Sequence, residues 1–381
     1  MKILGEIELQ KGHVDVCHLT SAHDRTDTRI FQKMCLSLHN YGYTVVLVVS
    51  DGKPEDTVDG VRVIGLPKIS SRFLRMIVAP YIVFLSAIKV RAKLYHFHDP
   101  ELLVACLLLR LFTRAKVIYD SHEDLPATIY AKTYIPSNLR GVISKISNSA
   151  EKMMAARMHA IIAATPHIQS KFKCHHDRVV DVCNFPIQVS APLAVAGPLK
   201  GVSRISYVGN LGVNRGIIEL IAALPLCKNN VRLDICGAFS EKGIEQTTRE
   251  NAGWEQVDFH GWVDEIKINT VLQQSSAGIV TLKPTPNYIH ALPIKMFEYM
   301  RAGLPVIASN FDLWKKIILK HECGIVVDPE SPEEIAKAID FVIENPILSL
   351  GMGKNGSKAV ESVFNWSIEE KKLIGLYEEL I

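Results

Sequence analysis

The sequence of 381 residues lacks the motifs that mark several common classes of protein. No GxGxxG motif follows the first predicted strand and no GxxxxGK[ST] motif occurs, so neither a dinucleotide dehydrogenase nor a P-loop enzyme is favoured. The eight cysteines form no CxxC pair and are scattered through apolar segments, which is typical of reduced core residues in a cytoplasmic protein. The N-terminal segment has neither a long apolar core nor a small-residue cleavage site, so we predict no secretory signal peptide.

An excess of charge of one sign is also lacking. The formal net charge is +3 and the pI is about 8.3, whereas a protein that tracks nucleic acid usually has a concentrated basic surface. We therefore expect no nucleic-acid partner. Hydrophobic residues make up 48% of the chain, which is enough to bury the cores of two domains at this length.

Short apolar runs alternate with helical patterns along most of the chain. This alternation is typical of parallel sheets with helices on both faces, so we predict an α/β protein with two doubly wound, Rossmann-like domains facing a crevice. The pattern starts again near residue 203, after a connection rich in Pro, Ala and Gly. We predict an N-terminal domain at 1–195, a C-terminal domain at 203–360 and a final helix at 361–381. Strands are predicted at 14–21, 44–50, 61–66, 93–98, 116–122, 160–165 and 179–185, and at 205–210, 231–237, 257–262, 277–282, 305–310 and 323–328.

The stretch ALPIKMFEYMRAGLPVIASN, residues 291–310, is the most informative part of the second domain. A proline-containing turn opens a short helix that ends in glycine and leads into a buried strand, with Lys295 and Glu298 on the helix. A helix N-terminus presents free N–H groups and a partial positive charge, which suit a phosphate, and a carboxylate one turn further on can accept the two hydroxyls of a ribose. These residues indicate a nucleoside diphosphate site. The alternative is a solvated Glu298 and a simple helix stop.

A second candidate for phosphate binding is the segment YVGNLGVNRGIIELIAAL, where a turn with Gly209 and Asn210 leads to Arg215. The rigid fork of an arginine suits phosphate oxygens, and glycine lets the backbone approach them closely. The alternative is an ordinary loop with a solvated arginine.

In the first domain, polar residues follow two predicted strands. His98 ends the strand in LYHFHDPELL, and His122 and Glu123 follow the strand in YDSHEDLP. Side chains at strand ends in a doubly wound domain are well placed to meet a substrate. The alternatives are a satisfied core histidine at His96 or His98 with Asp99 as a helix cap, and a helix-capping role for the YDSHEDLP segment.

Together these segments resemble the retaining glycosyltransferases of family 4, which have the two-domain GT-B fold. The 291–310 stretch is similar to the closing part of the family's EX7E motif: Glu298 matches the second glutamate, and His290 occupies the place of the first. The resemblance implies that His290, Ala291 and Leu292 line the donor sugar, that Glu298 binds the ribose and that Lys295 binds phosphate. Asn210 stands where the family usually has an arginine.

The same resemblance extends to other strand ends. The run with His98 is similar to the family's H-x-H-[DE]-P segment, which implies contact with the donor sugar, and the loop at Trp262 would lie beside the base. A packed Trp262 is the alternative. The first loop lacks the family's paired glycines and instead resembles bacterial surface-polysaccharide transferases. It carries His23, Asp27 and Arg29, which we place on the acceptor side with His122 and Glu123. The alternatives are an N-cap at Asp27 and a helix-surface charge at Arg29.

The activity implied is transfer of a hexose or N-acetylhexosamine from a nucleotide diphosphate sugar to a saccharide or lipid-linked acceptor in polysaccharide biosynthesis, with retention of configuration. No DxD run is present, so we expect no metal and no cofactor. His98, Arg215 and Lys295 are the predicted catalytic residues. The alternatives are a GT-B nucleotide-sugar 2-epimerase and a noncatalytic binding subunit.

A membrane surface is a further possible partner. From Arg62 to Lys93 there are seven basic residues and no acid, around the thirteen-residue apolar run MIVAPYIVFLSAI. That run is shorter than the roughly 20 residues that span a bilayer. We expect a cytoplasmic protein with peripheral contact at the inner face of an anionic membrane. The alternative is a helix packed on the first sheet with a solvated basic rim.

Overall fold

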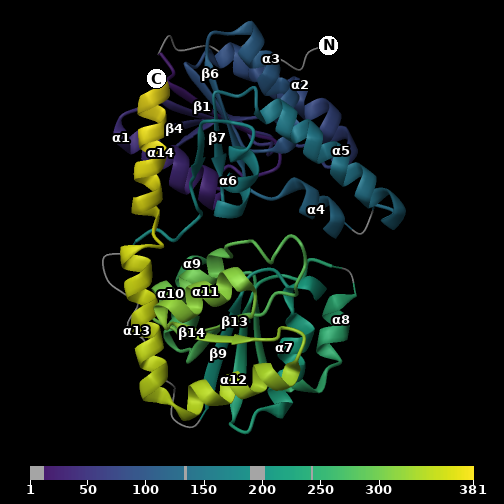
Figure 1. Ribbon diagram of the computed structural model, residues 1–381, viewed down its shortest axis with the longest axis vertical. Coiled ribbons are helices and arrows are strands. Elements are labelled where there is room, and N and C mark those ends of the chain that lie inside the picture. The colour runs from purple at the N-terminus through teal and green to yellow at the C-terminus, as the bar shows by residue number, and fades with distance from the viewer. Residues whose placement is uncertain (1–12, 133–134, 189–201, 242) are drawn as a thin grey trace. The chain divides into compact units, whose positions relative to one another are not determined.

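The computed structural model describes residues 13–132, 135–188, 202–241 and 243–381 (Figure 1). The chain divides into two compact units, of which the first comprises Met1–Asn184 with Ser367–Ile381 and the second comprises Phe185–Trp366. Most of the predicted interdomain connection falls at 189–201, outside the described residues. The C-terminal segment Ser367–Ile381 belongs to the first unit. The first unit otherwise ends at Asn184, before the predicted end of the N-terminal domain at residue 195.

The first unit is built on an eight-stranded sheet in the order β3-β4-β2-β1-β5-β6-β7-β8. All seven strands predicted in this half are present and parallel. The additional strand, β3, is a three-residue polar segment antiparallel to β4, and it has too little apolar pattern to be predicted. The strands are β1 (Val16–Thr20), β2 (Val45–Val49), β3 (Asp56–Val58), β4 (Val61–Gly65), β5 (Leu94–Phe97), β6 (Lys116–Ser121), β7 (Ala160–Ala163) and β8 (Val179–Asp181).

Helices cover both faces of this sheet. The inner sides of α2, α3, α5 and α6 share one hydrophobic core with alternate residues of the strands, including Tyr95 and Phe97. Because strand residues alternate between faces, His96 points to the opposite face, where Tyr377 of α14 lies 2.7 Å from its Nδ1 atom. The helical segments are η1 (Thr28–Cys35, a π-helix), α1 (Leu36–Tyr41), α2 (Arg72–Val90), η2 (Pro100–Leu102), α3 (Leu103–Phe112), α4 (Leu125–Ala131), α5 (Ser137–Ala155), α6 (Pro166–Lys173) and α14 (Trp366–Leu380).

The apolar run in the first half belongs to a longer helix than the sequence suggested. α2 has 19 residues, and its segment Phe73–Val90 is long and apolar enough to cross a bilayer by length and composition. The prediction that the apolar segment is too short to span a bilayer is therefore wrong for the helix as a whole. One side of α2 nevertheless packs into the core of the unit through Val83, Ala87 and Val90.

The second unit contains a six-stranded parallel sheet in the order β11-β10-β9-β12-β13-β14, and all six strands were predicted. They are β9 (Ser203–Val208), β10 (Val231–Cys236), β11 (Val257–Gly261), β12 (Ala277–Val280), β13 (Val306–Ser309) and β14 (Gly324–Val327). The helical segments are η3 (Val213–Arg215), α7 (Ile217–Ala223), η4 (Leu224–Leu226), α8 (Ile244–Arg249), η5 (Ala252–Gln256), α9 (Glu265–Gln273), α10 (Ile294–Arg301), α11 (Asp312–His321), α12 (Pro332–Glu344) and α13 (Pro346–Ser362).

Local signals explain why several of these helices begin where they do. The Ser331 hydroxyl accepts a hydrogen bond from the Glu334 amide at the start of α12, and Pro332 occupies the first helical position. Both features favour a helix N-terminus at this point. On its apolar side, α12 packs into the core of the second unit with α7 and the central strands.

Each sheet has a point where the strand order reverses. In the first unit β1 lies between β2 and β5, and in the second β9 lies between β10 and β12. In doubly wound folds, ligands bind outside the carboxyl ends of the strands at such a point. The candidate residues are found at these ends in both units.

Candidate functional site

The side-chain nitrogen of Lys295 is buried and has no hydrogen-bond partner among the described residues. Lys295 lies in the first turn of α10, with its Nζ atom 3.6 Å from the centroid of the Tyr207 ring in β9. Burial lowers the pKa of Lys295 well below its usual range, and the charge of Arg215 lowers it further. A buried cation without a counter-charge is unfavourable. This position is therefore suited to a negatively charged ligand.

Arg215 lies close to this lysine at the end of the η3 turn. Its guanidinium carbon is 5.2 Å from the centroid of the Tyr288 ring, so the side chain is partly packed rather than fully solvated. The next residue, Gly216, has φ of +68°, and a Cβ atom there would lie 1.8 Å from the carbonyl oxygen of Thr281. Only glycine fits this turn, and the turn sets the position of Arg215.

Gly209 brings the backbone against the same lysine. It has φ of +124°, and a Cβ atom at this residue would lie 3.4 Å from Nζ of Lys295. The neighbouring Asn210 has an exposed side chain, while its carbonyl oxygen accepts a hydrogen bond from the Tyr207 hydroxyl. The structure thus brings Gly209, Arg215 and Lys295 together at the carboxyl end of β9, the switch-point strand.

Glu298 lies one turn further along α10. Its carboxylate forms an ion pair of 2.6 Å with Arg301, and its side chain is partly exposed. The alternative of a solvated Glu298 therefore does not describe this carboxylate, which is paired with Arg301. Arg301 fixes its orientation and also reaches the carbonyl oxygen of Ile187.

The turn before α10 carries His290, Ala291 and Leu292. The indole N–H of Trp314 in α11 donates to the carbonyl oxygen of Ala291 at 2.7 Å, which ties the turn to α11. The His290 side chain is exposed, and Ala291 and Leu292 are half-buried. Among the described residues no side chain caps α10, since its N-cap residue is Pro293. The first turn therefore presents backbone N–H groups that no capping side chain occupies.

Trp262 follows β11 at the carboxyl edge of the sheet and is 82% exposed. The alternative of a packed core tryptophan is therefore wrong. An indole ring on the surface is unusual because burying it would be favourable. It offers a flat apolar face to a ligand.

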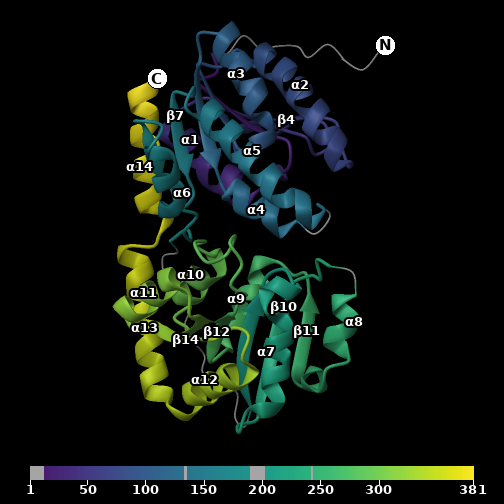
Figure 2. The same ribbon diagram turned by 45° about the vertical axis from the view of Figure 1, so that its right-hand side comes forward.

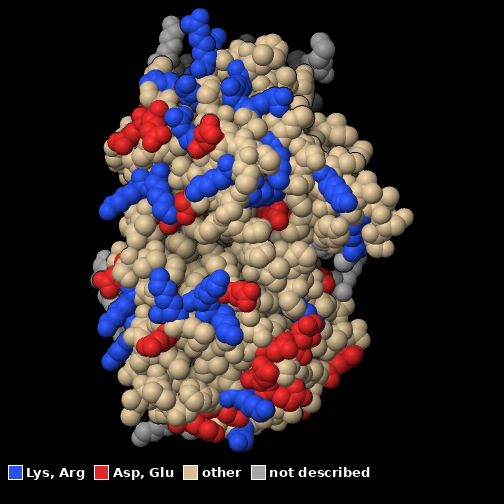
Figure 3. Space-filling view, in the orientation of Figure 1, with Lys and Arg blue, Asp and Glu red and all other residues tan. Residues whose placement is uncertain are grey.

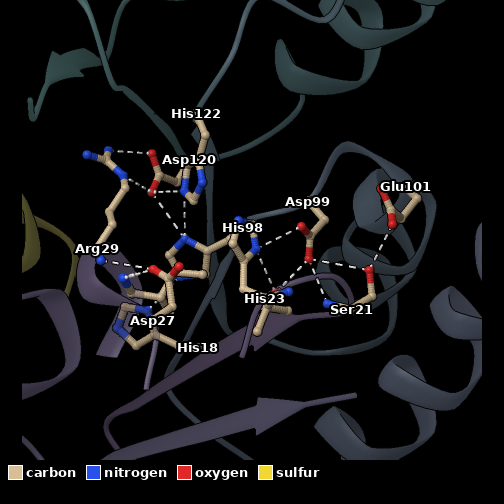
Figure 4. A network of polar contacts seen from close by, with 12 residues as sticks. His18, Ser21, His23, Asp27, Arg29, His98, Asp99, Glu101, Asp120 and His122 are labelled. Atoms are coloured by element: carbon tan, nitrogen blue, oxygen red, sulfur yellow. Dashed lines mark hydrogen bonds and ion pairs between the residues drawn. The ribbon is translucent and has the colours of Figure 1, made fainter. Parts of the chain in front are cut away.

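The centre of the polar network in the first unit is Asp120 at the end of β6 (Figure 4). Its carboxylate receives two hydrogen bonds from Arg29, at 2.8 and 3.1 Å, and lies 3.1 Å from Nδ1 of His98 and 2.7 Å from Nε2 of His122. Burial alone would raise the pKa of Asp120, but Arg29 and His122 hold it well below its usual range. Arg29 also donates to the carbonyl oxygen of Val182 and is 5% exposed. The interpretation of Arg29 as a helix-surface charge is therefore wrong.

His98 is enclosed by this network. Nδ1 faces Asp120, Nε2 lies 2.9 Å from Nδ1 of His18, and its side chain has no exposed surface. Burial lowers the pKa of His98 to about 4, so the ring is neutral near pH 7. Because Asp120 can only accept, Nδ1 of His98 carries the proton and Nε2 accepts from His18. His98 thus sits behind His122, whose side chain is partly exposed.

His23 and Asp99 form a second pair at the same sheet edge. Nδ1 of His23 lies 3.2 Å from Asp99, which also accepts hydrogen bonds from the Ser21 amide and the Thr20 hydroxyl. Burial disfavours a charged His23, but the hydrogen bond and charge of Asp99 outweigh it and raise the pKa of His23 to about 9. His23 is therefore a cation near pH 7, and its ring is 5.2 Å from that of His122.

Asp27 and Glu123 have local partners. The Asp27 carboxylate accepts from the amides of Arg29 and Ile30 and so caps η1, as its alternative interpretation predicted. The cap places Arg29 one residue into the segment, from where its side chain reaches Asp120. Glu123 accepts from the Thr128 hydroxyl beside the start of α4.

Sequence reasoning missed Asp120 and His18. Each lies inside a predicted buried strand, and an ionisable residue in such a run is a signal, because an unpaired charge is seldom buried. The sequence offered no indication that the partner of Asp120 would be Arg29, 91 positions away.

Two groups in the described part of the chain have ligand-type atoms close enough together to hold a metal ion, and both include His98. One adds His18 and His96, and the other adds Asp120 and His122. The guanidinium of Arg29 already neutralises Asp120 and opposes a second cation there. The expectation that no metal is used stays a prediction.

Comparison with known proteins agrees with the architecture. Over 97% of this chain and 99% of the other, the structure resembles sucrose-phosphate synthase from Thermosynechococcus elongatus, with a TM-score of 0.76 and 17% identity. It also resembles Anabaena Alr3699/HepE in complex with UDP, with a TM-score of 0.69 and 14% identity over 96% of this chain and 100% of that one. The two Rossmann-like units thus define a GT-B fold.

Family models identify the group more closely. Residues 28–184 match the Glycosyltransferase Family 4 model, and residues 197–359 match the model for glycosyl transferases group 1. The chain belongs to the family 4 glycosyltransferases.

Curated relatives match over part of their length. Glycogen synthase of Mycobacterium tuberculosis is 23% identical over 180 residues, 46% of this chain and 42% of that protein. Phosphatidyl-myo-inositol mannosyltransferase of Mycobacterium leprae is 27% identical over 196 residues, 50% of each. The chain thus matches about half the length of these relatives.

Proposed function

We propose that this protein is a retaining glycosyltransferase that moves a hexose or N-acetylhexosamine from a nucleotide diphosphate sugar to a saccharide or lipid-linked saccharide in polysaccharide biosynthesis. The observation that carries the proposal is the buried side-chain nitrogen of Lys295, which has no hydrogen-bond partner among the described residues and lies beside Arg215 and Gly209. A diphosphate would supply the missing negative charge. The UDP complex of the structurally similar Anabaena protein agrees with such a donor.

In this proposal the second unit stabilises the leaving group. The bond between the anomeric carbon and the phosphate oxygen breaks, and charge builds on the diphosphate. Arg215, Lys295 and the first turn of α10 would stabilise that charge, and fixed positive groups of this kind supply much of the catalysis in a site that excludes water. They would take the place of a metal ion. Glu298 would accept the ribose hydroxyls, and Trp262 would lie on the base.

The anomeric configuration of the sugar is retained if the acceptor attacks the anomeric carbon on the same face from which the diphosphate departs. The acceptor oxygen then bonds to the anomeric carbon, and its proton passes to the departing phosphate oxygen. This route needs no strong base or nucleophile from the protein. The first unit would hold the acceptor, with His122 and the cationic His23 facing it, and His98 would contribute by holding Asp120 and His122 in position.

A ligand screen followed by product analysis tests the proposal. The thermal shifts produced by UDP, GDP, ADP and dTDP are compared first. The nucleotide diphosphate sugars of the most stabilising nucleotide are then incubated with the protein in the presence of EDTA, with and without a saccharide acceptor. We expect a stabilising nucleotide, transfer unaffected by EDTA, and a product whose anomeric configuration by NMR equals that of the donor. An inverted product or a need for metal would contradict the mechanism.

Variants of the donor residues separate binding from catalysis. Glu298→Ala and Lys295→Met should lower kcat/KM by at least about tenfold, since each removes a charged contact of roughly 1.5 to 3 kcal/mol. Lys320→Met, which changes an exposed lysine on α11, serves as the matched control. Normal transfer by Glu298→Ala would refute the assigned site.

The two alternative functions give different results in the same experiments. Conversion of the donor without an acceptor would indicate a 2-epimerase. Nucleotide binding without any turnover would indicate a noncatalytic subunit, for which the exposed His290 in place of the first EX7E glutamate is the motivating observation. We also propose that the protein is cytoplasmic and works at the inner face of an anionic membrane.

A further inference from the structure

We propose that the outer face of α2, α3 and α5 in the first unit is a docking surface for an anionic lipid bilayer. This surface, termed here the three-helix face, consists of the side chains that these helices turn away from the sheet. The inference deepens the proposed function because it rests on a lipid-linked acceptor and identifies the part of the protein that would meet the lipid.

The three-helix face exposes large apolar side chains on each of its helices. The most exposed, at 64% to 74%, are Phe73, Met76 and Tyr81 of α2, Leu111 and Phe112 of α3, and Ile146 of α5. α2 packs against α3, and α3 packs against α5, so the three helices form one layer. Both ribbon views show them together on the side of the sheet opposite α14 (Figures 1 and 2). Apolar residues gathered in this way usually mark an interaction site.

The distribution of residue sizes on α2 supports this interpretation. Its core-facing stripe is made of Ala79, Val83, Ala87 and Val90, which are small or medium in size. Ile82 and Phe84 are partly buried against the same core, whereas the larger apolar side chains of Phe73, Met76, Ile77 and Tyr81 are exposed. A helix that only had to pack on the sheet would gain more by burying its larger side chains, so the outward face of α2 is adapted to a second apolar environment.

The packing of α2 also determines how it would meet a bilayer. Although Phe73–Val90 is long enough to span one, its inner stripe belongs to the core of the unit. Spanning would require that core to open. The helix would therefore lie along the membrane surface, with its outer side chains in the region between headgroups and acyl chains.

Charge on the three-helix face selects the type of lipid. The three helices contain a single acidic residue, Glu151, and it is buried in an ion pair with Lys171. Exposed cations include Lys89, Arg110 and Lys145. In Figure 3 the part of the surface over α5 shows basic and uncharged residues without acidic ones. Such a surface complements anionic headgroups.

The same charges disfavour a second copy of the chain as the occupant. Two copies packed through this face would bring cations together without acidic partners, and like charges in contact are unfavourable. The face is also connected to the site residues. Arg75 of α2 pairs with Glu101 at 3.0 Å, and Glu101 accepts from Ser21 beside Asp99. A lipid-linked acceptor in the same bilayer would thus be near the polar edge of the first unit.

Vesicle co-sedimentation of the full chain tests the proposal. Vesicles of phosphatidylcholine alone are compared with vesicles containing phosphatidylglycerol as well. We expect binding to the anionic vesicles that weakens with salt, and the variant Lys89→Gln/Arg110→Gln should weaken it about fivefold per charge removed. Equal binding to both vesicle types, or no binding to either, would overturn the proposal.

Apolar variants locate the surface. Met76→Ser/Tyr81→Ser and Leu111→Ser/Phe112→Ser should each lower the partition coefficient at least about tenfold. Ile347→Ser/Leu348→Ser, which changes exposed apolar residues of α13 in the second unit, is the matched control and should bind as the unchanged protein does. Loss of binding only in the α13 variant would place the surface elsewhere. A dimer without vesicles that the three-helix variants dissociate would indicate self-association instead.

The result is separable from the proposed transferase activity. The three-helix variants should keep their nucleotide-induced thermal shift, which also shows that they are folded. Lys295→Met should keep vesicle binding while it loses nucleotide binding. Loss of vesicle binding by Lys295→Met would mean that the two properties are not independent and would contradict the proposal.

Discussion

Arg29 and Asp120, which are 91 positions apart in the sequence, form a buried, bidentate ion pair with N–O distances of 2.8 and 3.1 Å. We expect Arg29→Met to lower the free energy of unfolding by about 3 to 5 kcal/mol, because it leaves the Asp120 charge buried without its main partner. The variant Arg29→Met/Asp120→Leu should recover part of that loss, since it removes the uncompensated charge. Urea denaturation followed by circular dichroism measures both. A loss below about 1 kcal/mol would show that the pair behaves as a solvated one.

His23 should give the first unit a pH-dependent stability. Its pKa is about 9 in the folded protein, above the ordinary value of about 6.5, so the protonated ring stabilises the fold. That contribution is complete below pH of about 6.5 and disappears as the pH rises through about 9, with an upper limit of about 3 kcal/mol. Between pH 6 and 9.5 the unchanged protein should therefore lose this contribution to its free energy of unfolding, and His23→Gln should not show that loss. His13→Gln, an exposed position, is the control, and an unchanged pH profile in His23→Gln would contradict the assignment.

Binding of a nucleoside diphosphate should be coupled to proton uptake at Lys295. Burial lowers the pKa of this lysine, and an anion would raise it again, so affinity should fall as the pH increases. Calorimetric titration of UDP in buffers with different ionisation enthalpies measures the protons taken up. We expect uptake by the unchanged protein and by Lys320→Met, and none by Lys295→Met. Uptake that persists in Lys295→Met would assign the proton to another group.

Trp262 should report the nucleotide. It is 82% exposed, whereas Trp314 and Trp366 are buried and Trp254 is half-buried. UDP should therefore protect Trp262 from acrylamide quenching, and Trp262→Ala should weaken binding by about 1 to 3 kcal/mol, the usual value of base stacking. Ile266→Ala changes an exposed neighbour in α9 and is the control. Equal quenching with and without UDP would exclude contact between the base and this ring.

Glycine at position 216 should be required for the Arg215 turn. In Gly216→Ala the new side chain would be strained by the positive φ and would clash with the Thr281 carbonyl oxygen. We therefore expect a loss of stability of more than about 1 kcal/mol and weaker UDP binding. Gly351 lies inside α13, where a Cβ atom would have no described neighbour within 4 Å, and Gly351→Ala should instead stabilise by roughly 0.5 to 1 kcal/mol. Thermal unfolding compares the two. A neutral Gly216→Ala would show that the turn can shift.

The predicted strands were recovered because each is a short apolar run bounded by polar residues, and burial of such runs is a local property of the sequence. The serine cap of α12 and the glutamates that follow it are local signals of the same kind. β3 was missed because its pairing with β4 comes from the hairpin rather than from its own apolar content.

The candidate site was predictable only in part. Lys295, Arg215 and Gly209 stand out in the sequence as a helix start and a glycine turn, and the structure brings them together. Asp120 and His18 were missed because their importance comes from partners on other strands and on η1. Trp262 was ambiguous, since whether an aromatic ring packs or faces solvent depends on neighbours far away in the chain.

The sequence by itself determined the alternation of strands and helices, the positions of the turns at strand ends and the absence of acid from α2, because each depends on residues close together in the chain. Only the tertiary structure decided that Arg29 would neutralise a buried aspartate, that His98 would be enclosed behind His122 and that Lys295 would lack a partner among the described residues. Those outcomes depend on which strands become neighbours in the sheet. Parallel strands pair through long connections, so side chains distant in sequence share the low-dielectric surroundings that set their charge and hydrogen bonding.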